Sequence, residues 1–117
     1  MALRCLLIDD SEEFLASASR LLAAQGLEIV GRASSGQEAV RLAEALRPDV
    51  ALVDLQLGDE DGLEVAWRLT ASGRPTAVVL ISMHPQDDMA ELIASSPAVG
   101  FLPKTALSAV AIAELVG

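Results

Sequence analysis

Lysine, cysteine, histidine and aromatic residues are scarce in this sequence of 117 residues, and no long apolar run is present. One cysteine forms neither an intramolecular disulfide nor a cysteine-based metal site, and the apolar run around Cys5 predicts a buried, unreactive thiol. No segment approaches the ~20 apolar residues of a membrane span. The first residues reach Asp9-Asp10 too soon to be a signal sequence. A cytoplasmic location and no membrane partner are therefore expected.

Basic residues are also few, with 8 Lys and Arg against 17 Asp and Glu and a net charge of −9. A phosphate backbone would be repelled by this charge, which predicts that the segment makes no direct contact with nucleic acid. The length fits one domain over residues 1–117, and the 52% hydrophobic fraction is ample for a packed core.

Short apolar runs alternate with segments of helical periodicity, which predicts five strands and five helices. The predicted strands cover residues 4–8, 27–33, 50–54, 76–82 and 99–102. The predicted helices run from about 11 to 25, from Ser35 to just before Pro48, from 61 to 72, from 87 to 95, and from Thr105, as its cap, to 116. The capping-box spacing at Ser35 and Asp61 supports two of these starts.

Strict alternation of strands and helices indicates an α/β fold with a parallel sheet and right-handed crossovers. We therefore predict a single doubly wound five-stranded parallel sheet with helices on both faces. The flavodoxin-like strand order 2-1-3-4-5 is the common one for five strands. In this order ligands bind beyond the carboxyl ends of the first and third strands.

Those two ends carry Asp9-Asp10 and Asp54, while Ser82 ends the fourth strand and the only lysine, Lys104, follows the fifth. Two carboxylates ~4 Å apart repel by roughly 4 kcal/mol at an effective dielectric near 20, so a cation, a shared proton or a lysine must compensate them. An all-oxygen site suits Mg²⁺, with Mn²⁺ as the other candidate. Aspartate also accepts phosphoryl groups. We therefore expect Asp9 and Asp10 to hold the metal and Asp54 to be phosphorylated, with the Ser82 hydroxyl and the Lys104 ammonium contacting the phosphoryl oxygens.

These residues, together with Phe101 and Pro103, occur in an order that resembles the receiver domain of two-component response regulators over essentially the whole chain. The resemblance implies phosphoryl transfer from a histidine kinase to Asp54. It implies a phosphoacceptor rather than an enzyme, with intrinsic autophosphorylation and autodephosphorylation. It also implies a metal contact from the backbone carbonyl of Gln56, and a switch in which Ser82 moves and Phe101 turns inward. The surface of the fourth helix, fifth strand and fifth helix would then change.

Residues 28–33 and 36–39 resemble the receiver subfamily that is fused to LuxR-type helix-turn-helix domains. This implies DNA contact through an output domain outside the segment, and a homodimer that forms on phosphorylation. Two positions depart from the family pattern. Gly58 replaces the usual proline, which predicts a looser loop, and Met83 is bulkier than the usual small residue, which predicts narrower access to Asp54.

Several alternatives remain open from the residues alone. Asp10 has the spacing of a helix N-cap, Phe101 is also a reasonable core residue, and His84 is expected in a loop near the site. The rival functions are a haloacid-dehalogenase-like phosphatase, a flavodoxin-like FMN carrier, and an interaction module without phosphorylation. The first family places a second acid where Gln56 stands. An FMN carrier would bring the FMN phosphate next to Asp9-Asp10, whose carboxylates would repel it.

Overall fold

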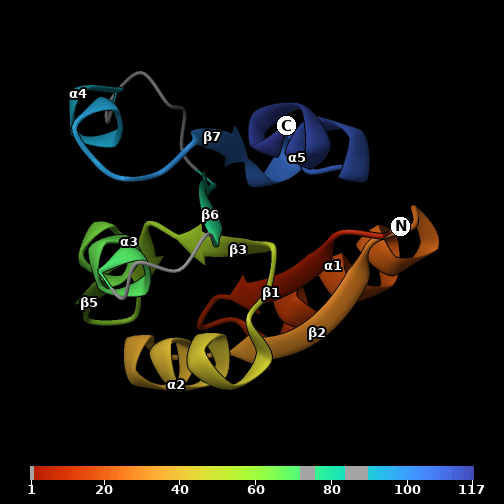
Figure 1. Cartoon of the computed structure of the whole chain (residues 1–117), viewed down its shortest axis with the longest axis horizontal. Helices are drawn as coiled ribbons and strands as arrows, with labels where there is room; N and C mark the ends of the chain where they lie inside the picture. The colour runs from red at the N-terminus through yellow and green to blue at the C-terminus, as the bar shows by residue number, and fades with distance from the viewer. Residues whose placement is uncertain (1, 72–75, 84–89) are drawn as a thin grey trace.

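A computed structural model describes residues 2–71, 76–83 and 90–117, and its central feature is a parallel five-stranded sheet (Figure 1). Its strands are β1 (Arg4–Ile8), β2 (Glu28–Ala33), β3 (Val50–Asp54), β6 (Ala77–Ser82) and β7 (Gly100–Pro103). The order in the sheet is β2-β1-β3-β6-β7. This is the predicted 2-1-3-4-5 arrangement, so the α/β fold and the topological switch between β1 and β3 are confirmed.

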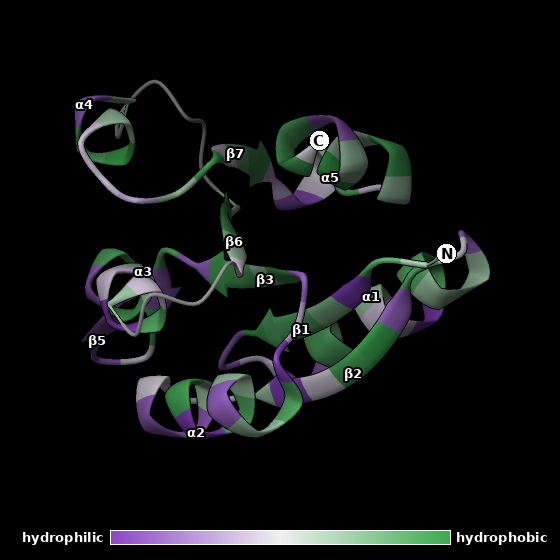
Figure 2. Cartoon of the chain, in the orientation of Figure 1, coloured by the Kyte–Doolittle hydropathy of each residue, from purple (hydrophilic) through white to green (hydrophobic). Residues whose placement is uncertain are grey.

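Helices cover both faces of this sheet, as predicted. They are α1 (Glu12–Ala24), α2 (Gly36–Leu46), α3 (Gly62–Thr70), α4 (Ala90–Ala94) and α5 (Ala109–Val116). One apolar cluster joins the sheet to α2, α3 and α4, and a second joins it to α1 and α5. The interior of β3 is apolar in Figure 2, before its last residue Asp54, as expected for a strand that is buried on both sides.

The alternation of side chains along β1 shows how the two clusters are divided. Leu6 and Ile8 belong to the cluster with α2, α3 and α4, whereas Cys5 and Leu7 belong to the cluster with α1 and α5. This is the two-residue period of a strand. Cys5 is a free, buried thiol, and its burial raises its pKa from 9.0 to about 12. The prediction that Cys5 is buried is confirmed.

The chain differs from the sequence prediction after β7. Lys104–Ala106 forms a short 3-10 helix, and α5 begins only at Ala109. The hydroxyl of Ser108 accepts a hydrogen bond from the Ala111 amide at 3.1 Å, so Ser108 rather than Thr105 caps α5. The prediction of Thr105 as the cap was wrong because a turn of 3-10 helix separates the strand from the helix. The first part of the predicted fourth helix, residues 87–89, lies outside the described residues.

A small antiparallel pair, β4 (Gln56–Leu57) and β5 (Glu60–Asp61), was not predicted and folds the loop after β3 back toward α3. The Gly62 amide donates to the Leu55 carbonyl at 2.9 Å, and a Cβ at Gly62 would overlap the Asp54 carbonyl oxygen. Glycine at this position therefore lets α3 start directly against the end of β3, which fixes the backbone that carries Asp54.

Candidate functional site

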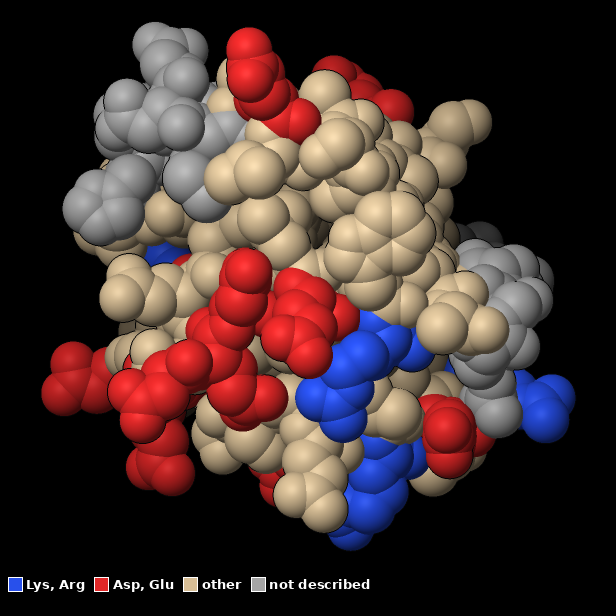
Figure 3. Space-filling model, turned by 90° about the vertical axis from the view of Figure 1, so that its left-hand side faces the viewer, with Lys and Arg blue, Asp and Glu red and all other residues tan. Residues whose placement is uncertain are grey.

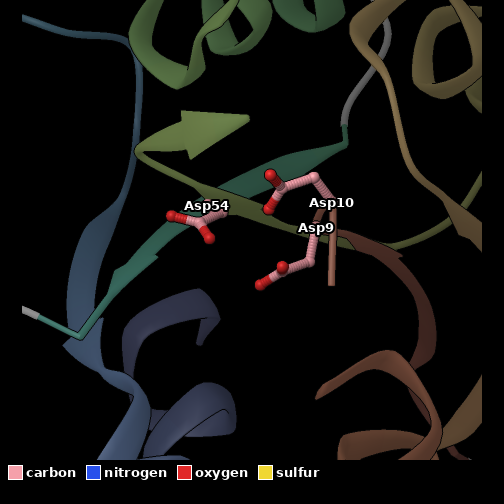
Figure 4. A group of neighbouring side chains, drawn as sticks. All are labelled: Asp9, Asp10 and Asp54. Carbon is pink, nitrogen blue, oxygen red and sulfur yellow. The ribbon is translucent and has the colours of Figure 1, made fainter. Parts of the chain in front are cut away.

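Three carboxylates gather at the carboxyl ends of β1 and β3 (Figure 4). One oxygen from each of Asp9, Asp10 and Asp54 lies within 4.8 Å of the others. Asp9 is completely buried and Asp54 is 8% exposed, while Asp10 lies at the surface. The structure therefore brings together the three aspartates that the sequence analysis assigned to one site.

Helix α1 begins shortly after Asp10, so the identity of its N-cap decides whether Asp10 serves as a helix cap. The N-cap is Ser11, whose hydroxyl accepts a hydrogen bond from the Phe14 amide at 3.2 Å. Asp9 Oδ1 in turn accepts the Ser11 amide hydrogen bond at 2.9 Å. The alternative in which Asp10 serves as the helix cap is therefore wrong, and its carboxylate is available to the cleft.

The Lys104 ammonium reaches back from the end of β7 into the acidic cluster. Its Nζ lies 2.6 Å from Asp9 Oδ2 and 2.9 Å from Asp54 Oδ2. The side chains of the three residues are 10%, 1% and 11% exposed, in the order Lys104, Asp9, Asp54, so these ion pairs are largely shielded from water. Shielding from water strengthens the attraction between the charges, but each charged group also loses favourable hydration.

Burial and charge pairing shift the pKa values of Asp9 and Lys104. Loss of hydration raises the pKa of the Asp9 carboxyl above 3.8, although the Lys104 ammonium and the Ser11 amide oppose the shift. Burial lowers the pKa of Lys104, but hydrogen bonds and charges from Asp9 and Asp54 outweigh it, so its pKa rises above 10.5. The Lys104 ammonium therefore stays charged at neutral pH, whereas burial destabilises the charged form of Asp9.

Asp54 faces an open cleft of about 310 Å³ that is lined by Asp10, Asp54, Gln56, Gly58, Ser82, Met83 and Lys104. Asp54 Oδ1 accepts a hydrogen bond from the Gln56 amide at 3.0 Å, so the backbone beyond β3 orients the carboxylate. Ser82 is buried at the end of β6 and lines the same cleft. Met83 also lines it and is 67% exposed. The cleft thus combines carboxylates, a hydroxyl and an ammonium around Asp54.

The carboxylate geometry fits a hard divalent cation. Mg²⁺ binds oxygen at about 2.1 Å, so two oxygens on opposite sides of the ion lie about 4.2 Å apart. The three carboxylate oxygens lie within 4.8 Å of one another, so small side-chain movements would bring them to the spacing that Mg²⁺ requires. Asp9 Oδ2 is buried and lies 2.6 Å from the Lys104 ammonium, so this oxygen already has a cationic neighbour. Oxygen ligands without nitrogen or sulfur favour Mg²⁺ or Mn²⁺ over Zn²⁺.

The loop around Gly58 is tied to the site, in contrast to the looser loop expected from the sequence. The Gly58 amide donates a hydrogen bond to Asp10 Oδ2 at 3.0 Å, and its φ is +57°. Proline has no amide hydrogen and cannot adopt this left-handed conformation. Glycine at this position therefore provides a backbone contact that holds a proposed metal ligand.

Replacing Gly58 by proline is expected to weaken Mg²⁺ binding about fivefold, because Asp10 loses a hydrogen bond worth about 1 kcal/mol that fixes its orientation. Gly58→Asn is the matched control, since asparagine keeps the amide and tolerates a left-handed φ. Isothermal titration with MgCl₂ measures both variants. Equal weakening in the two variants would show that the hydrogen bond is not the cause.

Two residues singled out from the sequence, Phe101 and His84, are not among the described residues that line the cleft. Phe101 is 7% exposed and belongs to the apolar cluster that contains Ile93 of α4. The predicted inward rotation of Phe101 therefore does not start from an exposed ring in this structure. His84 lies outside the described residues. Sequence reasoning also missed Phe14, whose ring centroid is 4.2 Å from Lys104 Nζ, because no motif pairs an aromatic residue in α1 with a lysine after β7.

The surface charge agrees with the composition. Figure 3 shows the side of the molecule that carries α2, β5, α3 and α4, where Asp and Glu side chains form a continuous patch beside a smaller group of Lys and Arg. This face has no broad basic surface to attract a phosphate backbone.

Comparison with known proteins agrees with this geometry. Residues 5–115 match the sequence profile described as "Response regulator receiver domain". The chain is 34% identical over 108 residues to the transcriptional regulatory protein LiaR of Bacillus subtilis, covering 92% of this chain and 51% of LiaR. It thus spans about half the length of the curated relatives it matches.

Solved structures resemble the whole described fold. The signal receiver domain of the response regulator NarL from Mycobacterium tuberculosis has a TM-score of 0.87 and 31% identity, covering 98% of this chain and 96% of that one. A response regulator from Burkholderia pseudomallei, solved with a phosphorylated aspartic acid, calcium ion and citrate, has a TM-score of 0.84 and 25% identity, covering 98% of this chain and 66% of that one. Within the described residues, no helix has the length and apolar character needed to cross a bilayer.

Proposed function

The chain belongs to the response regulator receiver domain family of two-component systems, and on this basis we propose that a histidine kinase phosphorylates it on Asp54. The observation that carries the proposal is the placement of the Lys104 ammonium 2.9 Å from Asp54 Oδ2, beside the carboxylates of Asp9 and Asp10. A nucleophilic carboxylate, a fixed cation and a metal-binding acid pair are what phosphoryl transfer to aspartate requires.

The transfer balances as a displacement at phosphorus. A carboxylate oxygen of Asp54 forms a bond to phosphorus while the bond between phosphorus and the donor histidine nitrogen breaks, and that nitrogen keeps the electron pair. The Gln56 amide orients the Asp54 carboxylate before transfer, and Lys104 is close enough to pair with a phosphoryl oxygen. Ser82 lines the cleft and offers its hydroxyl to another oxygen.

Asp9, Asp10 and Asp54, together with the backbone carbonyl of Gln56, are the proposed Mg²⁺ ligands, and Mn²⁺ has the same ligand preference. A bound divalent cation supplies charge neutralisation for the phosphoryl oxygens. The Burkholderia pseudomallei relative was solved with a calcium ion and a phosphorylated aspartic acid, which supports a divalent cation and an aspartyl phosphate on this fold. The same groups would support autophosphorylation from small phosphodonors and autodephosphorylation.

Phosphorylation adds about −1.5 to −2 charges and three acceptor oxygens next to Ser82 and Lys104. The response we propose is a population shift between two conformations, in which Ser82 moves toward the phosphoryl group and Phe101 repacks. Phe101 shares its cluster with Ile93 of α4, so a movement of its ring would reach the surface formed by α4, β7 and α5. This surface is the proposed output face, and a homodimer is one proposed result.

The proposal for the whole protein is a transcriptional regulator. It is supported by the likeness to LiaR, a transcriptional regulatory protein about twice as long as the matched segment. DNA contact would then fall to an output domain, in keeping with the net charge of −9 in residues 1–117, the proposed receiver domain. A cytoplasmic location stays a prediction. No observation at the site favours the phosphatase or the FMN carrier.

Incubation with acetyl phosphate and Mg²⁺ tests the proposed function. We expect acid-stable, base-labile labelling that intact-mass spectrometry detects as one added phosphoryl group, and that Asp54→Asn abolishes. Asp49→Asn is a suitable control, because Asp49 is an aspartate that precedes the same strand but contacts Arg4. Equal labelling of Asp54→Asn and wild type would overturn the assignment.

A further inference from the structure

Lys104 has a third neighbour besides the two carboxylates, and it comes from a different part of the chain. The ring centroid of Phe14 in the first turn of α1 lies 4.2 Å from Lys104 Nζ. Two carboxylates and one aromatic ring thus surround an ammonium whose side chain is 10% exposed. An aromatic face attracts a cation within about 6 Å, and the attraction grows when water is excluded.

The contacts that hold Phe14 start at Asp9 and return to it through Lys104. Asp9 Oδ1 accepts the Ser11 amide hydrogen bond at 2.9 Å, and the Ser11 hydroxyl accepts the Phe14 amide hydrogen bond at 3.2 Å. Phe14 faces Lys104, and Lys104 Nζ returns to Asp9 Oδ2 at 2.6 Å. Phe14 also packs against the apolar cluster of α1 and α5, which limits the movement of its ring.

We propose that Phe14 is a positioning residue that holds the Lys104 ammonium beside Asp54 through its aromatic face. The inference deepens the proposed function, because Lys104 is the cation on which phosphoryl transfer depends. An ammonium has three N–H donors and is strongly hydrated in water. The ring lies 4.2 Å from Nζ and competes with water for the ammonium, and it therefore disfavours solvated positions of Lys104 away from Asp54.

Substitutions that keep or remove the aromatic face separate this role from ordinary packing. Phe14→Leu keeps an apolar side chain but removes the ring, whereas Phe14→Tyr keeps the ring. We expect Phe14→Leu to slow acetyl phosphate labelling roughly fivefold, and Phe14→Tyr to retain the wild-type rate. Trp67→Leu is the matched control, since it removes an aromatic side chain that is 55% exposed on α3. Thermal melting of each variant shows whether it is folded.

A second readout does not depend on phosphorylation. Lys104 is the only lysine, so incorporation of ¹³C-labelled lysine gives one set of side-chain NMR signals. The aromatic ring current is expected to shift the Lys104 ε-proton signal upfield in wild type and Phe14→Tyr, and this shift is expected to be lost in Phe14→Leu. A wild-type signal at the position of the unfolded protein would overturn the proposal.

The outcomes distinguish the two proposals. Equal slowing by Phe14→Leu and Phe14→Tyr, or an unchanged rate in Phe14→Leu, would contradict positioning by the ring. If wild type is not labelled at all, the proposed function fails, and the NMR comparison still decides whether Phe14 positions Lys104.

Discussion

Replacing Asp9 by asparagine is expected to stabilise the metal-free protein and to weaken its response to Mg²⁺. Asp9 is completely buried, and burial raises its pKa, so its charge is costly in the folded state. Asparagine is nearly the same size and its Oδ1 still accepts the Ser11 hydrogen bond. We expect a gain of about 1 kcal/mol in the free energy of unfolding, or about 4 °C in the melting temperature.

The sign of the effect is expected to reverse when Mg²⁺ is present. A bound cation compensates the carboxylates of wild type, whereas the asparagine variant lacks one of the ligands, and its Mg²⁺ affinity should fall at least roughly tenfold. Thermal melting in EDTA and in MgCl₂ measures both effects. Asp59→Asn, an exposed position in the same loop as Gly58, is the matched control. A lower melting temperature of Asp9→Asn in EDTA would contradict the electrostatic account.

The stabilisation should also depend on pH with a defined sign. Folded Asp9 keeps its proton to a higher pH than the unfolded chain, whose carboxyl has a pKa of 3.8. The destabilisation of the folded state by the Asp9 charge is therefore absent below about pH 3.8. It appears as the unfolded carboxyl loses its proton, and it is complete above the raised pKa of the folded state. The advantage of the asparagine variant should thus grow from acid toward neutral pH.

The sheet and its order were predictable because the apolar runs are short, separate and closed by polar residues. Val50–Asp54 has no exposed residue, which matches its reading as a central parallel strand. Helix starts were predictable where a side chain accepts an amide hydrogen bond, as at Ser35 and Asp61. The start of α5 was not, because Thr105 and Ser108 are both suitable caps and only the three-dimensional path after β7 selects one.

The candidate site was predictable as a set of residues but not as a set of contacts. The meeting of Asp9, Asp10 and Asp54 follows from strand order, since the ends of β1 and β3 are neighbours. The tie from Gly58 to Asp10 depends on a left-handed φ in a loop. The contact of Phe14 with Lys104 joins residues far apart in the sequence. Such contacts depend on side-chain directions that no strand or helix pattern determines.

Removal of the Lys104 ammonium is expected to have the opposite effect to the Asp9 substitution. Lys104→Met keeps an apolar chain of similar length but leaves Asp9 and Asp54 without their shared cation. Breaking a buried ion pair from one side costs about 3 kcal/mol, so we expect a melting temperature roughly 10 °C lower in EDTA. Because Lys104 has a raised pKa, its stabilising effect is present below pH 10.5 and is lost above the folded pKa.

Mg²⁺ should restore part of the stability of Lys104→Met, because a divalent cation compensates the same carboxylates. Labelling by acetyl phosphate is nevertheless expected to be lost, since no fixed ammonium remains beside Asp54.

A double-mutant cycle isolates the pairing of Lys104 with Asp9. Asp9→Asn removes one of the two carboxylates that Lys104→Met leaves uncompensated, so in EDTA it should stabilise the Lys104→Met variant by more than the gain of about 1 kcal/mol expected in wild type. Arg41→Met is the matched control, since Arg41 forms an exposed ion pair with Glu38 at 3.7 Å, and such pairs contribute at most about 1 kcal/mol. Strictly additive effects of the two site substitutions would mean that Lys104 and Asp9 are not coupled. In that case the ammonium would serve Asp54 alone, and the burial of Asp9 would need a different compensating charge.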